Sequence, residues 1–263
     1  MKKFLGLVLA LIIAVGLAPA ASAVSLTNSD VNSRSSLAVV YSDGSSSATA
    51  NGYEARPALS LSKLYLGYWV MYHGSEQHKS QVEYMLRVSH DGLASEMDAA
   101  YPQAIDEIAR DFNLSSTSRN GYWGQSSTSA VDVARFVQSI RPDPAAAPVL
   151  RGMTTAAPVA NDGIGQNFGT SRLPGAWGTK YGWSNDLHSS TATVSFGDGW
   201  AAATMTYGDT QANTHDTLHG FGMAPAVGPL PVPAPELPEI GSTIPELEVP
   251  EELTDVLNST TGF

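Results

Sequence analysis

The chain has 263 residues, 43% of them hydrophobic, which is enough to bury a full core as one sizeable domain or two small ones. Charged residues make up only 15% and the formal net charge is −11, which disfavours a nucleic-acid groove or an acidic-membrane patch because both need clustered Lys and Arg. Cysteine is absent, which excludes disulfides, thiolate nucleophiles and cysteine-based zinc sites.

The N-terminal segment, residues 1–23, has the pattern of a signal peptide. Two lysines precede an apolar run at residues 4–17, and small residues at 21–23 suit a signal peptidase. An uncleaved membrane anchor is the alternative, but the run is shorter than the roughly 20 residues of a membrane span. We therefore expect a secreted, extracytoplasmic protein whose mature chain has no transmembrane helix.

Residues 24–223 are predicted to form one mixed domain. Alternating apolar patterns and turn residues predict five strands, at residues 36–41, 47–53, 178–184, 191–196 and 200–207. Helical periodicity predicts helices at residues 59–73, 79–88, 94–111 with a break at Pro102, and 129–140, followed by a loop-rich stretch at 141–176. The order predicts an α+β fold with three α/β/α layers, in which an antiparallel sheet built from both ends of the domain carries an inserted helical lobe.

The C-terminal segment, residues 224–263, is expected to lie outside the folded domain. It contains eight of the 16 prolines and seven acidic residues, with no Lys or Arg. Such a composition favours an extended, solvated chain. The segment is either a spacer or contact arm at the cell envelope, or a disordered tail without a specific partner.

The first motif, Ser60-x-x-Lys63, falls at the start of the predicted buried helix, in its first turn. Positions three apart lie on one face of a helix, so the Ser60 hydroxyl and the Lys63 amine can meet. A serine hydroxyl becomes a nucleophile when a base takes its proton, and burial lowers the pKa of a lysine so that it can be that base. Taken alone, such a pair also arises by chance.

Two further motifs follow. Ser89-x-Asp91 lies between two predicted helices and offers a hydroxyl that relays a proton and a side chain that holds a substrate amide, although Ser and Asp are also ordinary helix caps. Lys180-Tyr181-Gly182 lies on a predicted strand, where the glycine lets a substrate backbone approach the sheet edge. A lysine that protects an edge strand from aggregation is the alternative there.

In this order and setting the three motifs resemble those of the serine β-lactamases and penicillin-binding DD-peptidases, closest to a short, secreted, class A-like member. The resemblance covers most of residues 36–207. It implies that Ser60 is acylated and that Lys63 is its base. It further implies that Ser89 relays a proton to the leaving group, and that Lys180 orients Ser89 and attracts a substrate carboxylate.

The same resemblance implies a substrate-binding set made of Asp91, Tyr181, Gly182 and Trp183, with the backbone N–H groups of Ser60 and Trp183 as the oxyanion hole. Two of these positions depart from the family pattern. Asp91 stands where the family usually has Asn, and an ionised Asp only accepts hydrogen bonds. Tyr181 replaces a Thr or Ser, so a compact hydroxyl for a substrate carboxylate is missing.

Two longer-range departures concern the lobe and the release of product. The interval from Ser60 to Ser89 is shorter than in full-length β-lactamases, which predicts a shortened helical lobe and a more open cleft. Class A β-lactamases carry a loop glutamate that activates water, whereas residues 112–131 contain no Asp or Glu. Fast lactam hydrolysis is therefore not expected.

The positions of the lysines favour an active enzyme over a catalytically degenerate family member. The chain has five lysines, of which Lys2 and Lys3 belong to the predicted signal peptide. Of the other three, Lys63 and Lys180 occupy the two lysine positions of the family pattern. Arg could not replace Lys63 as a base because it does not lose its proton.

A metal-dependent reaction has weaker support in the sequence. His215 and His219 are spaced for zinc chelation, but no third ligand and no catalytic glutamate accompany them, so no metal or other cofactor is expected. The sequence thus predicts a monomeric serine hydrolase that forms an acyl-Ser60 intermediate with a peptidoglycan stem peptide or a β-lactam. The alternative is a catalytically degenerate member that binds peptidoglycan or a protein.

Overall fold

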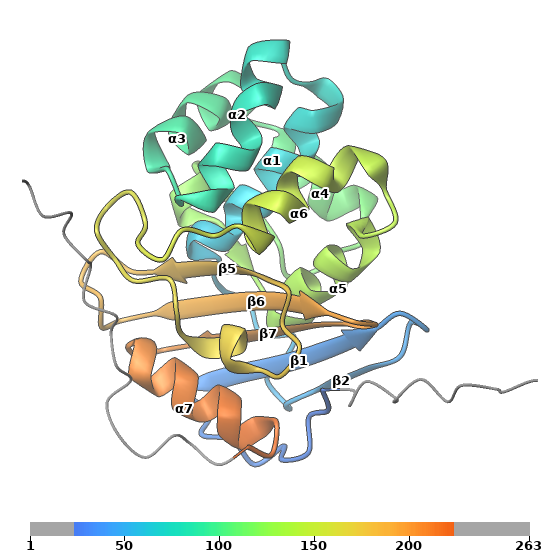
Figure 1. The fold of residues 1–263 in the computed structure, drawn as a ribbon, viewed down its shortest axis with the longest axis vertical. Coiled ribbons are helices and arrows are strands. Elements are labelled where there is room, and N and C mark those ends of the chain that lie inside the picture. The colour runs from blue at the N-terminus through green and yellow to red at the C-terminus, as the bar shows by residue number, and fades with distance from the viewer. Residues whose placement is uncertain (1–23, 224–263) are drawn as a thin grey trace, which may run out of the picture. The chain divides into compact units, whose positions relative to one another are not determined.

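A computed structural model describes residues 24–223 (Figure 1). The predicted signal peptide and the C-terminal tail lie outside the described residues. Within them, one antiparallel sheet separates a layer of six helices from a single helix on its other face, as the three-layer α+β prediction requires. No helix between residues 24 and 223 has the length and apolar character needed to cross a membrane.

The sheet joins the two ends of the domain. Its strands lie in the order β2, β1, β7, β6, β5, and every neighbouring pair is antiparallel. Strand β1 starts at Ser35, opposite Thr206 of β7, and ends at Tyr41, opposite Trp200. The strands are β1 (Ser35–Tyr41), β2 (Ser46–Ala48), β5 (Gly178–Trp183), β6 (Thr191–Gly197) and β7 (Trp200–Thr206).

The second strand is shorter than predicted. The sequence pattern extends it to residue 53, but it ends at Ala48 because the next residues form a turn. The Gly52 N–H donates to the Thr49 carbonyl at 2.8 Å, and the Asn51 amide donates to the carbonyls of Ser33 and Ser35 at 3.1 and 3.0 Å. These bonds turn the chain away from the sheet edge.

The helical lobe sits on one face of the sheet (Figure 1). Its helices are α1 (Ser62–His73), α2 (Glu76–Arg87), α3 (Asp91–Ala100), α4 (Ala104–Asp111), α5 (Ala130–Ile140) and α6 (Ala147–Thr154). Short 3₁₀ turns and one small strand pair precede or separate these helices: η1 (Leu59–Leu61), η2 (Trp123–Gln125), η3 (Pro144–Ala146), β3 (Arg56–Pro57) and β4 (Ser127–Thr128). A further 3₁₀ turn, η4 (Gly169–Arg172), follows α6 and packs against helix α7 (Thr210–Gly220), on the other face of the sheet. The break at Pro102 separates α3 from α4 as predicted.

Helix α1 runs through the core of the lobe, and this burial fixes the site described below. Its residues from Ser62 to Val70 are all buried. The Tyr65 ring packs edge-on against Phe136 of α5 with 4.8 Å between ring centroids, and the Tyr65 hydroxyl is 2.7 Å from that of Thr128. Burial of large side chains stabilises a fold by about 25 cal/mol per Å² of apolar surface, so α1 is held rigidly.

Two helices are absent from the sequence prediction. Helix α6 lies in the stretch expected to be loop-rich, where its eight residues include Pro148 and Gly152 and give little periodic signal. Helix α7 (Thr210–Gly220) covers the other face of the sheet (Figure 1), and its buried side includes the polar Asn213 and Thr217. Apolar periodicity therefore could not predict α7. The one local signal for the helix is Asp209, whose side chain caps its N-terminus.

A buried carboxylate ties α7 to β1. Asp216 accepts hydrogen bonds from Arg34 Nε at 2.8 Å, Arg34 Nη2 at 3.0 Å and Ser35 Oγ at 2.6 Å. Burial acts to raise the pKa of Asp216, but these donors outweigh it and the pKa lies below its ordinary value of 3.8.

We expect Asp216→Asn to lower the free energy of unfolding by about 2 kcal/mol at neutral pH, because the substitution removes the negative charge that pairs with the Arg34 guanidinium. The difference from wild type should shrink as the pH falls below 3.8, because the unfolded wild-type carboxyl group then binds a proton while the folded one, with its lower pKa, must still be forced to do so. Urea denaturation at several pH values measures both effects. Asp111→Asn, at the exposed end of α4, is the matched control, and an equal loss in it would contradict the assignment.

Candidate active site

Ser60 and Lys63 meet as their spacing predicts, although Ser60 lies in η1 rather than in the first turn of α1. The Lys63 Nζ donates to the Ser60 Oγ at 2.6 Å. The turn begins with Leu59 at a φ of 53°, in the left-handed region that non-glycine residues rarely adopt. Such strain persists where the surrounding structure imposes it, here on the residue before the serine.

Lys63 is enclosed on several sides. Its side chain is fully buried, the Asp91 Oδ1 accepts a hydrogen bond from Nζ at 2.6 Å, and Nζ lies 4.2 Å from the ring centroid of Trp123. Burial lowers the pKa of Lys63, while the Asp91 carboxylate acts to raise it. Sequence reasoning missed Trp123, because nothing in its loop indicates contact with α1.

Lys180 and Ser89 form a second pair beside the first. The Lys180 Nζ donates to the Ser89 Oγ at 2.7 Å and to the Tyr181 carbonyl at 3.0 Å, and both side chains are buried. Burial first, and then repulsion from Lys63, holds the pKa of Lys180 well below its usual range. Ser89 connects α2 to α3 with a φ of 54°, so it too has a strained backbone. We call Ser60, Lys63, Ser89 and Lys180 the Ser60 cluster.

Strand β5 is the edge strand beside this cluster. The Ser184 N–H donates to the Ser190 carbonyl at 2.9 Å, and the register of β5 with β6 continues from that pair. Because backbone groups alternate along an antiparallel strand, those of Trp183 and Tyr181 point off the free edge. The bond from Lys180 to the Tyr181 carbonyl agrees with this direction.

Gly182 lets η1 approach β5 closely. A Cβ atom at this position would lie 2.8 Å from the Leu59 Cβ and 2.9 Å from the Ser60 backbone nitrogen. A side chain here would therefore separate the serine from the strand. The Ser60 N–H is thus held beside the edge from which the Trp183 N–H projects, which is the arrangement needed to bind an oxyanion.

The side chains of Tyr181 and Trp183 make their contacts with residues outside the Ser60 cluster. Tyr181 is buried, with its ring 5.3 Å from that of Phe168, so its hydroxyl does not replace the compact hydroxyl of the family pattern. The Trp183 Nε1 donates to Asp162 Oδ2 at 2.9 Å. Asp162 acts to raise the pKa of both buried lysines. No sequence pattern indicates this role for Asp162, because it lies on the loop after α6.

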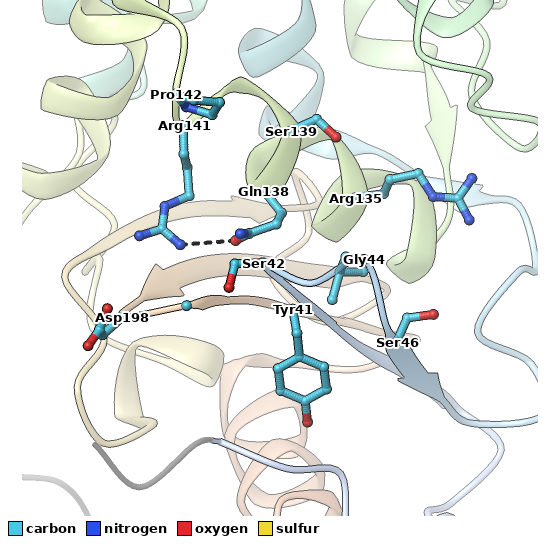
Figure 2. A pocket seen from close by; sticks show the side chains of 12 residues that line it. Tyr41, Ser42, Gly44, Ser46, Arg135, Gln138, Ser139, Arg141, Pro142 and Asp198 are labelled. Carbon is cyan, nitrogen blue, oxygen red and sulfur yellow. Dashed lines mark hydrogen bonds between the residues drawn. The ribbon is translucent and has the colours of Figure 1, made fainter. Parts of the chain in front are cut away.

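A cavity of about 850 Å³ lies elsewhere, between α5 and the turns that follow β1 and β6 (Figure 2). Arg135, Arg141 and Asp198 contribute its charges, and Arg141 donates to Gln138 at 3.0 Å. None of its lining residues belongs to the Ser60 cluster. The cavity therefore does not define the candidate active site.

The histidine pair considered from the sequence lies on α7, on the other face of the sheet. The rings of His215 and His219 are stacked with centroids 6.4 Å apart. Within residues 24–223, no group of three or more His, Cys, Asp or Glu side chains could hold a metal ion.

Comparison with solved structures identifies the fold as that of the penicillin-binding proteins and serine β-lactamases. A D-alanyl-D-alanine carboxypeptidase from Mycobacterium tuberculosis H37Rv aligns with a TM-score of 0.53 and 17% identity, over 80% of this chain and 98% of that one. A halotolerant bacterial β-lactamase aligns with a TM-score of 0.56 and 13% identity, over 73% of this chain and 95% of that one. Penicillin-binding protein D2 from Listeria monocytogenes, bound to cefotaxime, gives 0.53 and 15%, over 71% and 95%. No protein-family model matches the chain, and no curated protein matches it by sequence.

We expect Lys180→Met to raise the free energy of unfolding by about 1 kcal/mol at neutral pH, because a buried amine is replaced by an apolar side chain of similar length. The pKa of Lys180 is near 10.5 in the unfolded chain and lower in the folded protein. The wild type therefore gains stability as the pH rises from the folded pKa towards 10.5. The advantage of the variant should therefore shrink towards pH 10.5.

Urea denaturation of both proteins across this pH range measures the effect. Lys79→Met is the control, because Lys79 pairs with the exposed Glu76 at the surface. A variant that is less stable at every pH would mean that the bonds to Ser89 and Tyr181 outweigh the burial of the amine.

Proposed function

We propose that the protein is a secreted serine hydrolase of the β-lactamase and penicillin-binding type, which forms an acyl-Ser60 intermediate with a cell-wall peptide or a β-lactam. The observation that carries the proposal is the 2.6 Å contact between the Lys63 Nζ and the Ser60 Oγ, next to the Lys180–Ser89 pair. A serine hydroxyl bonded to a buried amine is the arrangement that activates a nucleophile.

The proposed acylation uses each member of the Ser60 cluster. Neutral Lys63 takes the Ser60 hydroxyl proton while the Oγ attacks the carbonyl carbon. The N–H groups of Ser60 and Trp183 stabilise the resulting oxyanion. Ser89 passes a proton to the leaving nitrogen as the C–N bond breaks, and Lys180 orients Ser89 and attracts a substrate carboxylate.

Hydrolysis of the acyl-enzyme is proposed to be slow. The Trp123 ring lies against Lys63, so an aromatic surface covers one side of the amine that would activate water. The loop from residue 112 to 131 carries no carboxylate that could take over this role. A stable acyl-enzyme is the expected result.

A non-catalytic role is the second candidate, and the Lys63–Asp91 contact favours it. A carboxylate 2.6 Å from Nζ stabilises the ammonium form, which cannot accept the Ser60 proton. If Lys63 never loses its proton, the domain binds peptidoglycan or a protein without acylation. The signal-peptide pattern of residues 1–23 supports an extracytoplasmic location for either activity.

Fluorescent penicillin distinguishes the two candidates. We expect stable covalent labelling of the wild type and none of Ser60→Ala, since the variant lacks the attacking oxygen. Gel fluorescence measures the label, and mass spectrometry locates the adduct. Ser62→Ala is the matched control, because its hydroxyl bonds the Leu59 carbonyl at 2.7 Å rather than Lys63. No labelling of the wild type at high probe concentration would favour the binding role.

We expect nitrocefin to acylate the protein in a burst of about one equivalent, followed by turnover slower than about 0.1 s⁻¹, well below ordinary enzyme rates. The reason is the lack of a water-activating carboxylate in residues 112–131. Stopped-flow absorbance separates the burst from the steady state. Rapid steady turnover would contradict the inference and would assign water activation to another group.

A further inference from the structure

Asp91 presents a carboxylate at the mouth of the candidate site. Its Oδ1 accepts from the Lys63 Nζ, yet 64% of the side chain is exposed. The Ser60 Oγ and Asp91 Oδ1 each lie 2.6 Å from the same Nζ, so the two oxygens are no further apart than twice that distance. The side chain that flanks a carbonyl at Ser60 is therefore within reach of Asp91.

The charges around this point are arranged in two levels. Lys63 and Lys180 are buried beneath the surface, whereas Asp91 on α3 and Asp162 on the loop after α6 are more exposed. The carboxylates thus lie at the surface of the site, and the two lysine amines lie beneath them. An ionised carboxylate accepts hydrogen bonds and donates none, so its natural partner on a ligand is an ammonium group or another strong donor.

We propose that Asp91 makes the site selective for acyl donors that carry a protonated amine on the side chain that flanks the scissile carbonyl, as an amino-substituted peptide or lactam does. This inference rests on the proposed acylation of Ser60 and adds its substrate class. The amine and the carboxylate form a charge-assisted hydrogen bond in the bound state.

The same contact couples binding to chemistry. In the free protein Asp91 stabilises the Lys63 ammonium; when a ligand ammonium takes over the carboxylate, the pKa of Lys63 falls and its extra proton passes to water. Neutral Lys63 then accepts the Ser60 proton as the Oγ–C bond forms and the C–N bond breaks, and the leaving nitrogen gains a proton through Ser89. A neutral ligand offers no such replacement, so it is acylated more slowly.

Benzylpenicillin and ampicillin test the proposal because they differ by one amino group on the side chain. We expect ampicillin to acylate the wild type about fivefold faster in second-order rate, which corresponds to the roughly 1 kcal/mol upper range of an exposed ion pair. In Asp91→Asn the ratio should fall to about one. The same variant should acylate faster with benzylpenicillin at low pH, because Lys63 then loses its proton more easily.

Asp111→Asn controls for the change in net charge, and its ratio should equal that of the wild type. N-acetylampicillin removes the charge from the ligand instead, and it should react with the wild type as slowly as benzylpenicillin. This comparison decides the question even if Asp91→Asn does not fold. Intact-protein mass spectrometry over time measures every rate.

Equal rates for ampicillin and N-acetylampicillin in the wild type would overturn the proposal, as would a ratio unchanged by Asp91→Asn. Failure of the proposed function gives a different result: no penicillin acylates the wild type, or acylation persists in Ser60→Ala. In that case the substrate selectivity falls with the acylation on which it rests.

Discussion

The burial of two lysine amines against two serine hydroxyls is the constraint on which the rest of the site depends. Water would surround an exposed lysine and keep it protonated, whereas Lys63 and Lys180 are almost wholly removed from solvent. Their hydrogen bonds to Ser60 and Ser89 partly compensate the cost of desolvation. Lys79, which pairs with Glu76 at the surface, shows the contrast within the same chain.

The fold produces this burial by bringing three distant segments together. Lys63 lies in the first turn of the buried helix α1, Ser89 lies in the connection between α2 and α3, and Lys180 lies on the edge strand β5. Gly182 allows β5 and η1 to approach within contact distance. Strained backbone at Leu59 and Ser89 is tolerated because the packed elements on either side hold it.

The electrostatic surroundings of the Ser60 cluster depend on three further residues, Asp91, Asp162 and Trp123. The two carboxylates oppose the effect of burial on the lysines, and the indole covers one side of Lys63. A buried amine is thus paired with a carboxylate that is exposed to solvent. We infer that a ligand bound at Asp91 would change the pKa of Lys63, which a fully enclosed ion pair would not allow.

By itself, the sequence determined the sheet built from both ends of the domain, the buried α1, the break at Pro102 and the three motifs with their order. These are local signals, because apolar period, turn residues and three-residue spacing all act over a few positions. Only the tertiary structure decided that Lys63 contacts Asp91 and Trp123, that Asp162 reaches Trp183, and that α7 packs with a polar side. The physical reason is that these contacts join segments tens of residues apart, and no local pattern specifies which distant partner a side chain meets.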